Sequence, residues 1–441
     1  MIQNKKQIIW KIIKDFLQNP VKNIFPRKEK IKFNSKIRKV YTIIWPRRAW
    51  KSYFCFQTIN DLLENWINKN QILYFNIEND EVDLENNDDL NLILNTFFEI
   101  VSFDKNKKYF IFFDEIQEIE NWEKFVRKIL DNFENIEIII TGSSSKLLSK
   151  EIATSLRWRS LVYEIFPLSF KEILIWNNLN LDFFSTQEQI KFNQLKENFL
   201  RNGSFPEIVL SNYNDDIQKI LKDYLDLVFY KDIVERNNFK DIKKLKEFRK
   251  YLMSFIWDFF SYSKVEKELF LNYRTLQNWI WAFSDSFLIF ELKKFSFSIW
   301  NQQRSNSKIY LVDNWFYNLL FWHYKEDLWK IFENLVFMEL RKSWFIENEN
   351  IFYFKEGNFD IDFILFKNWK ILPIQVCYSL NKENYKREIL QLEKFIKKFN
   401  LDKWYIVVFE EDEKIDLPEN IEILKFAENI FYFNNLFKEI L

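Results

Sequence analysis

The feature that most constrains the fold is a loop that follows a short apolar run, Val40–Ile44. From residue 45 the chain reads Trp-Pro-Arg-Arg-Ala-Trp-Lys-Ser, which has the spacing of a phosphate-binding loop, Gly, four residues, Gly-Lys-Ser/Thr, with Trp at both glycine positions. Such a loop wraps backbone N–H groups around a phosphate, which requires positive φ angles and close approach of the backbone. Trp provides neither. The loop is therefore either disabled, or its two Trp letters stand for another residue.

Composition bears on this choice. The chain has 3 Gly and 17 Trp, whereas a chain of this length usually carries about 30 Gly. Several Trp stand where glycine is expected: Trp66 and Trp344 follow helical runs, Trp369 completes an Asn-x hairpin turn, and Trp315 completes another Asn-x turn. We hypothesise that UGA codons, which some bacterial lineages read as glycine, were translated here as Trp. UGG codons at positions 45, 50 and 369 would refute this.

Two other Trp residues fit their positions. Trp122 and Trp279 lie in helical runs with apolar neighbours, and we expect both to be genuine core residues. The glycine hypothesis therefore applies to turns and to the loop, and it leaves the core Trp residues unchanged.

Charge is balanced over the whole chain but uneven along it. The formal net charge is zero, so total charge gives no reason to expect nucleic acid. Met1–Lys51 holds 15 Lys and Arg against 2 Asp and Glu, while Glu78–Asp89 has seven acids and no base. A basic arm beside a phosphate site can steer nucleotides or nucleic acid. The alternative is a solvated basic surface balanced by an acidic loop.

Several classes of protein are unsupported. Two cysteines and one histidine give no basis for a disulfide framework, a zinc site or a histidine-based catalytic triad. No apolar run reaches the roughly 18 residues of a membrane span, and the basic segment Asn4–Leu17 has the pattern of an amphipathic helix rather than a signal peptide. These patterns predict a cytoplasmic protein without membrane contact.

A second apolar run, Tyr109–Phe113, ends in two carboxylates, Asp114 and Glu115. It lies about 60 residues after Lys51, with a strand and a helix expected between. In phosphate-loop enzymes a buried strand delivers an Asp to Mg²⁺, and a following Glu can polarise the attacking water. We therefore expect Lys51 to hold the β- and γ-phosphates of ATP, Ser52 and Asp114 to hold Mg²⁺, and Glu115 to position the water.

Two further groups are candidates near this site. Strand Ile136–Ile140 ends in polar residues, of which Thr141 and Ser143 are placed to sense the γ-phosphate or hold the water, although a helix N-cap is the alternative at Ser143. Arg157 and Arg159 can stabilise charge during phosphoryl transfer, in cis or in trans, or form surface salt bridges. The expected nucleotide-binding residues are Trp45, Pro46, Arg47, Arg48, Ala49, Trp50, Lys51, Ser52, Thr141 and Ser143, and the expected catalytic residues are Glu115, Lys51, Arg157 and Arg159.

These motifs together resemble a known family. The chain is similar to prokaryotic AAA-superfamily ATPases that carry a C-terminal domain of unknown function, and with glycine at 45, 50 and 158 the match covers almost the entire chain. The resemblance implies ATP binding and hydrolysis, with a helical lid from Phe170 to Asn237. It rests on Trp45-Pro-Arg-Arg-Ala-Trp-Lys-Ser52, Phe113-Asp-Glu-Ile-Gln117, Thr141-Gly-Ser-Ser-Ser-Lys-Leu-Leu148, Leu156-Arg-Trp-Arg159, Phe166-Pro-Leu-Ser-Phe170 and Gly203-Ser-Phe-Pro-Glu207.

The segment Ser261–Phe290 looks like a winged helix whose second helix is Tyr273–Phe283. Arg274 and Gln277 lie near the start of that helix, where winged helices contact DNA. The segment is not strongly basic, and a winged helix can instead serve as a protein contact. DNA and a partner protein therefore both remain open.

The C-terminal part has the layout of a restriction-endonuclease-like fold: a helix with Glu333, a hairpin with Asp362, and a strand with Gln375. Active sites of this kind gather Mg²⁺ with three such residues and carry a lysine two positions after the third. Here an amide replaces one carboxylate and Cys377 stands at the lysine position. We therefore predict a degenerate metal site without cleavage, and Glu333 and Asp362 can equally be structural.

The chain is thus predicted to be an α/β protein with a doubly wound parallel sheet. We expect an ATPase core in residues 1–165, a helical lid and winged helix in 166–300, and a nuclease-like domain in 301–441. The predicted function is Mg²⁺-dependent ATP binding and hydrolysis. A non-enzymatic nucleotide-dependent switch or scaffold that binds DNA or a partner protein through the winged helix and C-terminal domain is the alternative, and a metal-dependent nuclease is the third.

Overall fold

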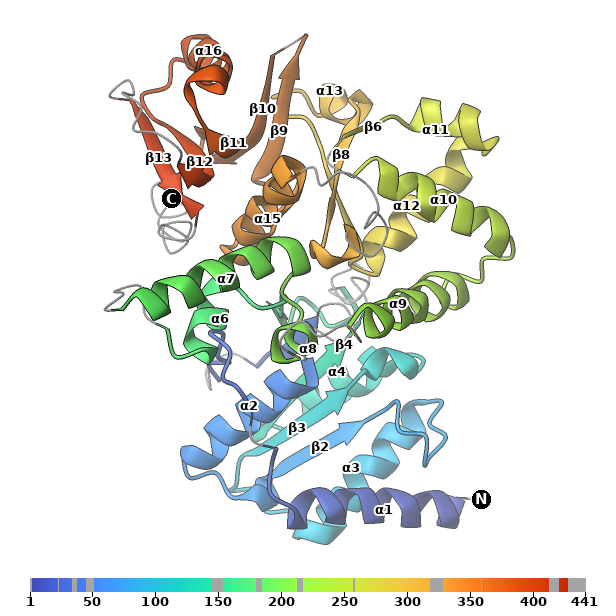
Figure 1. Cartoon of the computed structure of the whole chain (residues 1–441). Helices are drawn as coiled ribbons and strands as arrows, with labels where there is room; N and C mark the ends of the chain where they lie inside the picture. Colours follow the sequence, from blue (N-terminus) through green and yellow to red (C-terminus); the bar gives the residue numbers. More distant parts are fainter. Residues whose placement is uncertain are drawn as a thin grey trace. The chain divides into compact units, whose positions relative to one another are not determined.

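The computed structural model shows two compact units, Met1–Phe166 and Pro167–Leu441, which are described one at a time (Figure 1). The structure describes residues 2–22, 24–33, 38–44, 51–143, 154–179, 185–211, 217–256, 258–317, 328–357, 359–411 and 420–426.

The first unit is built on a five-stranded sheet with strand order β2-β3-β4-β1-β5, and every neighbouring pair is parallel. The first four strands are largely buried, as expected for a parallel sheet covered on both faces. The predicted doubly wound sheet is confirmed. Sequence analysis did not predict β5, because its polar ends and partly exposed residues hide the strand pattern. The strands are β1 (Val40–Ile44), β2 (Ile72–Asn76), β3 (Tyr109–Asp114), β4 (Ile136–Gly142) and β5 (Ser160–Glu164).

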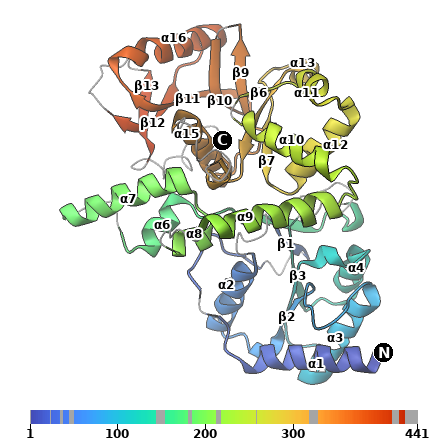
Figure 2. The same ribbon diagram turned by 45° about the vertical axis from the view of Figure 1, so that its right-hand side comes forward.

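Helices cover both faces of this sheet. Helix α2 (Lys51–Glu64) lies on one face, and α3 (Asn87–Val101) and α4 (Trp122–Asn132) lie on the other (Figures 1 and 2). The apolar side of α2 packs onto the side chains of β1 in one core cluster. Helix α1 (Ile2–Gln18) is the predicted amphipathic helix of the basic arm, and Lys5 on α1 forms an ion pair of 2.8 Å with Asp89 on α3.

The second unit begins with helices. Helix α6 and helix α7 each start with a capping box, in which Ser169 and Ser185 accept from the backbone of Glu172 and Glu188. Helix α9 passes directly into a π-helix, η4, within the range expected to form the helical lid. The elements are α6 (Phe170–Trp176), α7 (Thr186–Asn202), α8 (Pro206–Leu210), α9 (Ile217–Leu227), η4 (Val228–Glu235) and α10 (Ile242–Ser254).

A small antiparallel sheet follows, with strand order β6-β8-β7. Two helices lie between its first two strands in sequence, and α12 covers the range predicted as the second helix of the winged-helix segment. The elements are β6 (Phe259–Phe260), α11 (Tyr262–Leu269), α12 (Tyr273–Asp285), β7 (Ile289–Leu292), α13 (Ile299–Arg304) and β8 (Ser307–Leu311).

The last part is a second five-stranded sheet with order β13-β12-β11-β10-β9. The pairs β9–β10 and β10–β11 are antiparallel, whereas β11–β12 and β12–β13 are parallel, with α16 in the crossover from β11 to β12. The elements are α15 (Leu328–Lys342), β9 (Ile351–Glu356), β10 (Phe359–Lys367), β11 (Lys370–Leu380), α16 (Lys382–Phe399), β12 (Trp404–Glu411) and β13 (Ile421–Lys425).

The two sheets of the second unit are joined through the segment that follows β7. Phe295 N–H donates to the Tyr353 carbonyl at 2.6 Å, and Tyr353 N–H donates to the Lys293 carbonyl at 3.1 Å. The segment therefore runs beside β9, and the Phe295 side chain belongs to the core of the larger sheet. Among the described residues, no helix combines the length and apolar character that crossing a bilayer requires.

Four Trp residues have left-handed backbone conformations. Trp66, Trp158, Trp344 and Trp369 have φ angles of 63°, 59°, 72° and 64°, and their side chains are 96%, 68%, 62% and 84% exposed. A bulky residue with positive φ is a strong outlier, and glycine is the residue that usually occupies this region. Three of them, Trp66, Trp344 and Trp369, stand at turns where glycine was expected, and the fourth, Trp158, belongs to the family motif.

Three further Trp residues differ from those four. Trp122 and Trp279 are buried in helices α4 and α12, as expected of core residues. The prediction of a glycine-like turn at Trp315 is wrong, because its φ angle is not positive and its ring is buried against Phe205, Tyr224 and Phe316.

Candidate functional site

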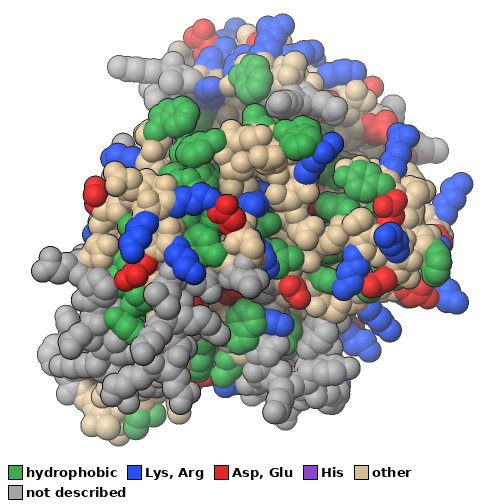
Figure 3. All heavy atoms as spheres, turned by 90° about the horizontal axis from the view of Figure 1, so that it is seen from above, with side chains coloured by type: hydrophobic (Ala, Val, Ile, Leu, Met, Phe, Trp, Pro, Cys, Tyr) green, Lys and Arg blue, Asp and Glu red, His purple; other side chains and the backbone are tan. Residues whose placement is uncertain are grey.

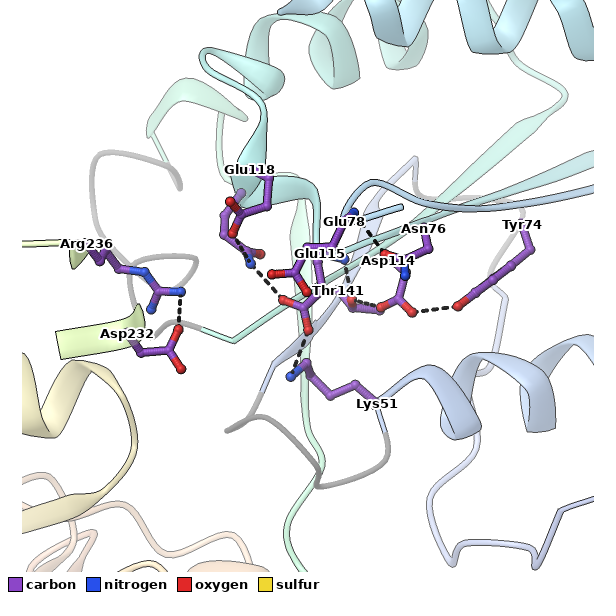
Figure 4. Close-up of polar contacts among 11 residues, drawn as sticks. Lys51, Tyr74, Asn76, Glu78, Asp114, Glu115, Glu118, Thr141, Asp232 and Arg236 are labelled. Carbon is purple, nitrogen blue, oxygen red and sulfur yellow. Dashed lines mark hydrogen bonds and ion pairs between the residues drawn. The ribbon is translucent and has the colours of Figure 1, made fainter. Parts of the chain in front are cut away.

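The strands of the first unit end together at one edge of the sheet. In the register, Ile44 pairs with Gly142 and Ile43 with Thr141, while Asn76 pairs with Asp114. The carboxyl ends of parallel strands are the usual ligand-binding edge of an α/β sheet. The chain that leaves β1 toward Lys51 therefore starts beside the ends of the strands that carry Asp114 and Thr141 (Figure 4).

Lys51 is the first residue of helix α2, and its side chain is buried. Its Nζ lies 3.2 Å from Glu115 Oε1. Six residues connect the end of β1 to Lys51, so a buried strand and a helix N-terminus are separated by the number of residues that a phosphate-binding loop requires. The predicted loop residues Trp45, Pro46, Arg47, Arg48, Ala49 and Trp50 lie outside the described residues.

Asp114 ends β3 and is almost fully buried, with 1% of its surface exposed. Tyr74 OH donates to Asp114 Oδ2 at 2.6 Å, and the Thr141 hydroxyl donates to Oδ1. Burial and the neighbouring Glu115 charge raise the pKa of Asp114, while hydrogen bonds from Ser52, Thr141 and Tyr74 lower it. A buried carboxylate of this kind is stabilised when a cation binds beside it.

Ser52 and Asp114 supply the oxygen ligands of the predicted Mg²⁺ site, and the Ser52 side chain hydrogen-bonds Asp114. Mg²⁺ is usually held by one or two carboxylates together with substrate phosphates and water. Within the ranges that the structure describes, no group of three His, Cys, Asp or Glu forms a metal-binding arrangement. One carboxylate and one hydroxyl at a phosphate loop therefore fit Mg²⁺ that arrives with a nucleotide.

Glu115 has a left-handed conformation, with φ 56° and ψ 47°. Its N–H donates to Thr141 Oγ1 at 2.9 Å, and Gln117 Nε2 donates to Glu115 Oε2 at 2.7 Å. Its carboxylate thus contacts both the Gln117 amide and the Lys51 ammonium, and Figure 4 shows the contact with Lys51. Strained conformations of this kind cluster at functional sites, where surrounding contacts hold them in place.

The Thr141 hydroxyl joins the two acidic residues, because it accepts from Glu115 N–H and donates to the Asp114 carboxylate. Thr141 is therefore held against the carboxylates rather than directed at open solvent. Ser143 is buried at the end of the same strand. Sequence analysis gave no role to Tyr74 or Gln117. Tyr74 lies two residues before Asn76, the register partner of Asp114 on β2, and this pairing leaves no local signal in the sequence.

Arg157 and Arg159 lie away from these groups. They precede β5, and Ser160 at the start of β5 pairs with Val40 at the start of β1. Because the strands are parallel, both arginines stand at the amino-terminal edge of the sheet, opposite the edge that carries Asp114. Arg159 forms an ion pair of 2.8 Å with Asp131, as the salt-bridge alternative predicts. Within one chain neither arginine joins the Lys51 site, so a role in cis is excluded by the register.

The structure also brings Glu333, Asp362 and Gln375 together in the second unit. Gln375 Oε1 accepts from Asp362 N–H at 3.4 Å. A fourth residue, Lys308 on β8, was not predicted, and its Nζ lies 2.8 Å from Glu333 Oε1 and 3.2 Å from Asp362 Oδ1. No sequence pattern pointed to Lys308, since its contact depends on how the two sheets of this unit pack.

Comparison with known proteins assigns part of the chain to described families. Residues 37–174 match a family described as AAA domain, and residues 193–321 match a family described as domain of unknown function. The matched AAA domain contains β1 to β5 and all the residues of the Lys51 site. The resemblance of these motifs to AAA-type phosphate-loop ATPases is thereby confirmed.

Two relatives match most of the chain. Over 439 residues the chain is 40% identical to an uncharacterized protein of Methanocaldococcus jannaschii, with 96% of this chain and 95% of that protein covered. It is 28% identical over 350 residues to an uncharacterized protein of Haemophilus influenzae, with coverage of 78% and 84%. Among solved structures, AMPPCP-bound DnaA from Aquifex aeolicus has a TM-score of 0.25 and 14% identity, over 55% of this chain and 68% of that one.

Proposed function

The chain belongs to the family of the Methanocaldococcus jannaschii protein, and from its AAA domain we propose that it binds ATP with Mg²⁺ and hydrolyses it. The observation that carries this proposal is the convergence of Lys51, at the start of α2, with Asp114 and Glu115 at the carboxyl edge of the parallel sheet. Those three side chains have the charges that phosphoryl transfer uses.

Each residue has a separate role in the proposed reaction. Lys51 neutralises the β- and γ-phosphates. Ser52 and Asp114 would hold Mg²⁺, which would supply positive charge against the phosphate oxygens. Glu115 orients the attacking water. Thr141 fixes the spacing of the two acids through its hydroxyl.

In the absence of nucleotide, the ion pair with Lys51 keeps a Glu115 oxygen from binding water. The Lys51 ammonium lies 3.2 Å from Glu115 Oε1. A bound γ-phosphate attracts the Lys51 ammonium. When the ammonium moves to the phosphate, one Glu115 oxygen becomes free, while Gln117 still holds the other. The carboxylate then becomes available for water only when nucleotide is present.

This proposal requires glycine at positions 45 and 50. The positive φ angles of the four exposed residues Trp66, Trp158, Trp344 and Trp369 support the UGA hypothesis, because glycine adopts these angles without steric cost. Trp158 also belongs to the motifs that carry the family resemblance. We propose that the functional chain has glycine at these four positions and at 45 and 50.

ATP turnover tests the proposed roles. The protein with glycine at 45 and 50 should release phosphate from ATP in the presence of Mg²⁺, and Glu115→Gln should lower kcat by about 10²- to 10³-fold while ATP still binds. Glu120→Gln, an exposed acid on the same loop, is the matched control and should leave kcat unchanged. Equal turnover in the Glu115→Gln and Glu120→Gln variants would rule out the assigned role.

The remaining parts of the chain have proposed fold assignments. We propose an ATPase core in residues 1–165, a helical lid and winged helix in 166–300, and a nuclease-like domain in 301–441. The order β6-β8-β7 with helices α10, α11 and α12 supports the winged helix. Helix α15, the hairpin of β9 and β10, and the parallel crossover from β11 to β12 support the nuclease-like fold.

A second function, contact with DNA or a partner protein, is favoured by one face of α12. Tyr273, Arg274, Gln277 and Trp281 are exposed at helical spacing on that helix. Figure 3 shows the molecule from above, where Lys and Arg side chains are interspersed with acidic and hydrophobic ones. Fluorescence anisotropy with duplex DNA distinguishes DNA contact from contact with a partner protein. DNA binding by the parent protein that is lost in Arg274→Ala supports DNA contact, and no DNA binding by the parent protein supports a protein partner.

A further inference from the structure

Lys308 is a buried cation in the nuclease-like part of the molecule. It lies on β8, only 4% of its surface is exposed, and its ammonium contacts Glu333 Oε1 on α15 and Asp362 Oδ1 on β10. A nuclease-like site of this layout would hold a metal ion between the same two carboxylates. The lysine amine thus stands where that ion would stand.

The other polar atoms around Lys308 are also engaged. Tyr310 OH donates to Glu333 Oε1 at 2.6 Å, and Val376 N–H donates to Asp362 Oδ2 at 3.0 Å. The amide of Gln375 accepts from Asp362 N–H and donates from Nε2 to Glu388 Oε2 at 3.0 Å. The cluster is therefore a connected hydrogen-bond network around an ammonium, and each of the two carboxylates already has a cationic partner.

The position of Lys308 follows from the packing of two sheets. The segment after β7 pairs with β9 through Phe295 and Tyr353, and the Tyr353 hydroxyl donates to the Asn306 carbonyl next to β8. On the far side, Asn334 of α15 accepts from Leu311 N–H at 2.8 Å. Strand β8 is thus held by contacts with Tyr353 and with α15, and it brings Lys308 to the carboxylates of Glu333 and Asp362.

The charge on Lys308 is retained. Burial alone would lower its pKa, but the nearby Glu333 and Asp362 carboxylates raise it above the usual value for lysine. Burial raises the pKa of Glu333 to about 7, against the opposing effect of Lys308. Removal of the ammonium would leave two carboxylates facing each other in a buried pocket, which is a strongly unfavourable arrangement unless another cation enters.

We propose that Lys308 is the resident cation of this pocket, that it takes the place of a divalent metal between Glu333 and Asp362, and that its removal uncovers a site for Mn²⁺ or Mg²⁺. Mg²⁺ binds oxygen at about 2.0–2.1 Å, so the metal and the ammonium exclude each other from the same oxygens. The nuclease-like domain is then held together by a lysine instead of a metal ion. This goes beyond the proposed ATPase, because it concerns a different domain and uses none of the Lys51 site.

Metal binding to the full chain without nucleotide tests the proposal. Titration with Mn²⁺, followed by electron paramagnetic resonance, should show that Lys308→Ala binds about one more ion than the parent protein. The double variant Lys308→Ala/Asp362→Asn should lose that ion, which assigns it to this pocket. The Lys51 site is identical in all three proteins, so any Mn²⁺ that it binds cancels in the comparison.

Thermal unfolding provides a second measurement, which can also be made on variants of reduced stability. Lys308→Met should lower Tm by about 10 °C, because it leaves the buried carboxylates unpaired. The triple variant Lys308→Met/Glu333→Gln/Asp362→Asn, which removes all three charges, should recover most of that loss. Added Mn²⁺ should raise the Tm of Lys308→Ala and leave that of Lys308→Ala/Asp362→Asn unchanged.

Three results would overturn the proposal. The first is Mn²⁺ bound by the parent protein and lost in Asp362→Asn. The second is a Lys308→Ala variant that is folded but gains neither Mn²⁺ nor a Mn²⁺-dependent rise in Tm. The third is Mn²⁺-dependent nicking of plasmid DNA that Lys308→Met abolishes, which would make Lys308 the catalytic lysine of an active nuclease.

Discussion

At the scale of single residues, Gly203 and Trp66 both have positive φ angles, but the space around them differs. Gly203 has φ 76°, and a Cβ there would lie 1.6 Å from Asp313 Oδ1, so both the angle and the space require glycine. Trp66 has φ 63°, but its side chain is 96% exposed and meets no such obstacle. A side chain at position 66 therefore costs only conformational strain. Its effect on the free energy of unfolding can be measured there without a steric clash.

The glycine hypothesis predicts a gain in stability at Trp66. In the Trp-containing protein, Trp66→Gly should raise the free energy of unfolding by about 1 kcal/mol, because it relieves a left-handed conformation in an exposed turn. Trp122→Gly, at a buried position of α4, is the control and should lower it by about 3–5 kcal/mol. Urea unfolding of both variants gives the two values. A loss of stability in Trp66→Gly would count against glycine at that turn.

At the scale of elements, Asp313 connects the end of α7 to the end of β8. Its Oδ2 accepts from Ser204 N–H and from Ser204 Oγ, each at 2.8 Å, and its Oδ1 accepts from Trp315 N–H at 3.1 Å. Beside it, Asn314 Nδ2 donates to the Leu200 carbonyl at 2.8 Å. Two loops far apart in sequence are thus joined by buried hydrogen bonds within the second unit.

The buried Asp313 carboxyl should make the free energy of unfolding depend on pH. Burial raises the pKa of Asp313 to about 6, against about 3.9 in an unfolded chain. The folded state therefore binds this proton more tightly, and the resulting stabilisation is present below about pH 4 and is lost as pH rises through about 6. Between pH 5 and pH 8 the parent protein should lose about 1 kcal/mol more than Asp313→Asn. Parallel pH profiles for the two proteins in urea unfolding would contradict the raised pKa.

Most elements around the candidate site could be predicted, because each leaves a local signal. The apolar runs that end at Ile44 and Asp114 mark buried parallel strands, and the Lys51-Ser52 pair marks the start of a helix. Contacts between side chains that depend on which strands pair could not be predicted from such local signals. Tyr74 meets Asp114, Arg157 stands at the opposite edge, and Lys308 reaches Glu333 only because strands distant in sequence pair with one another.

At the scale of the whole molecule, the position of Arg157 and Arg159 bears on assembly. Both precede β5 at the amino-terminal edge of the sheet, so neither can serve the nucleotide held by Lys51 of the same chain. Arg159 pairs with Asp131, whereas Arg157 is exposed in a turn with φ 53°. Of these two arginines, we predict that Arg157 is the one that acts, and that it acts on the nucleotide of a second chain.

Turnover should then depend on protein concentration. The protein with glycine at 45 and 50 should hydrolyse more ATP per chain as its concentration rises, and Arg157→Ala should lower kcat by about a hundredfold or more with ATP affinity retained. Arg201→Ala is the control, since that guanidinium pairs with Glu197 on its own helix. Turnover per chain that is constant with concentration and equal in both variants would show that the arginine has no role in trans.

The central claim is that Lys51 holds the phosphates of ATP once glycine occupies positions 45 and 50. Equilibrium binding of a fluorescent ATP analogue with Mg²⁺ tests it most directly, in the glycine form, in that form with Lys51→Ala, and in that form with the exposed Lys124→Ala. The account predicts binding to the glycine form and to Lys124→Ala, about a hundredfold weaker binding to Lys51→Ala, and poor binding to the chain with Trp45 and Trp50. Equal affinity in the glycine form and in Lys51→Ala would contradict it.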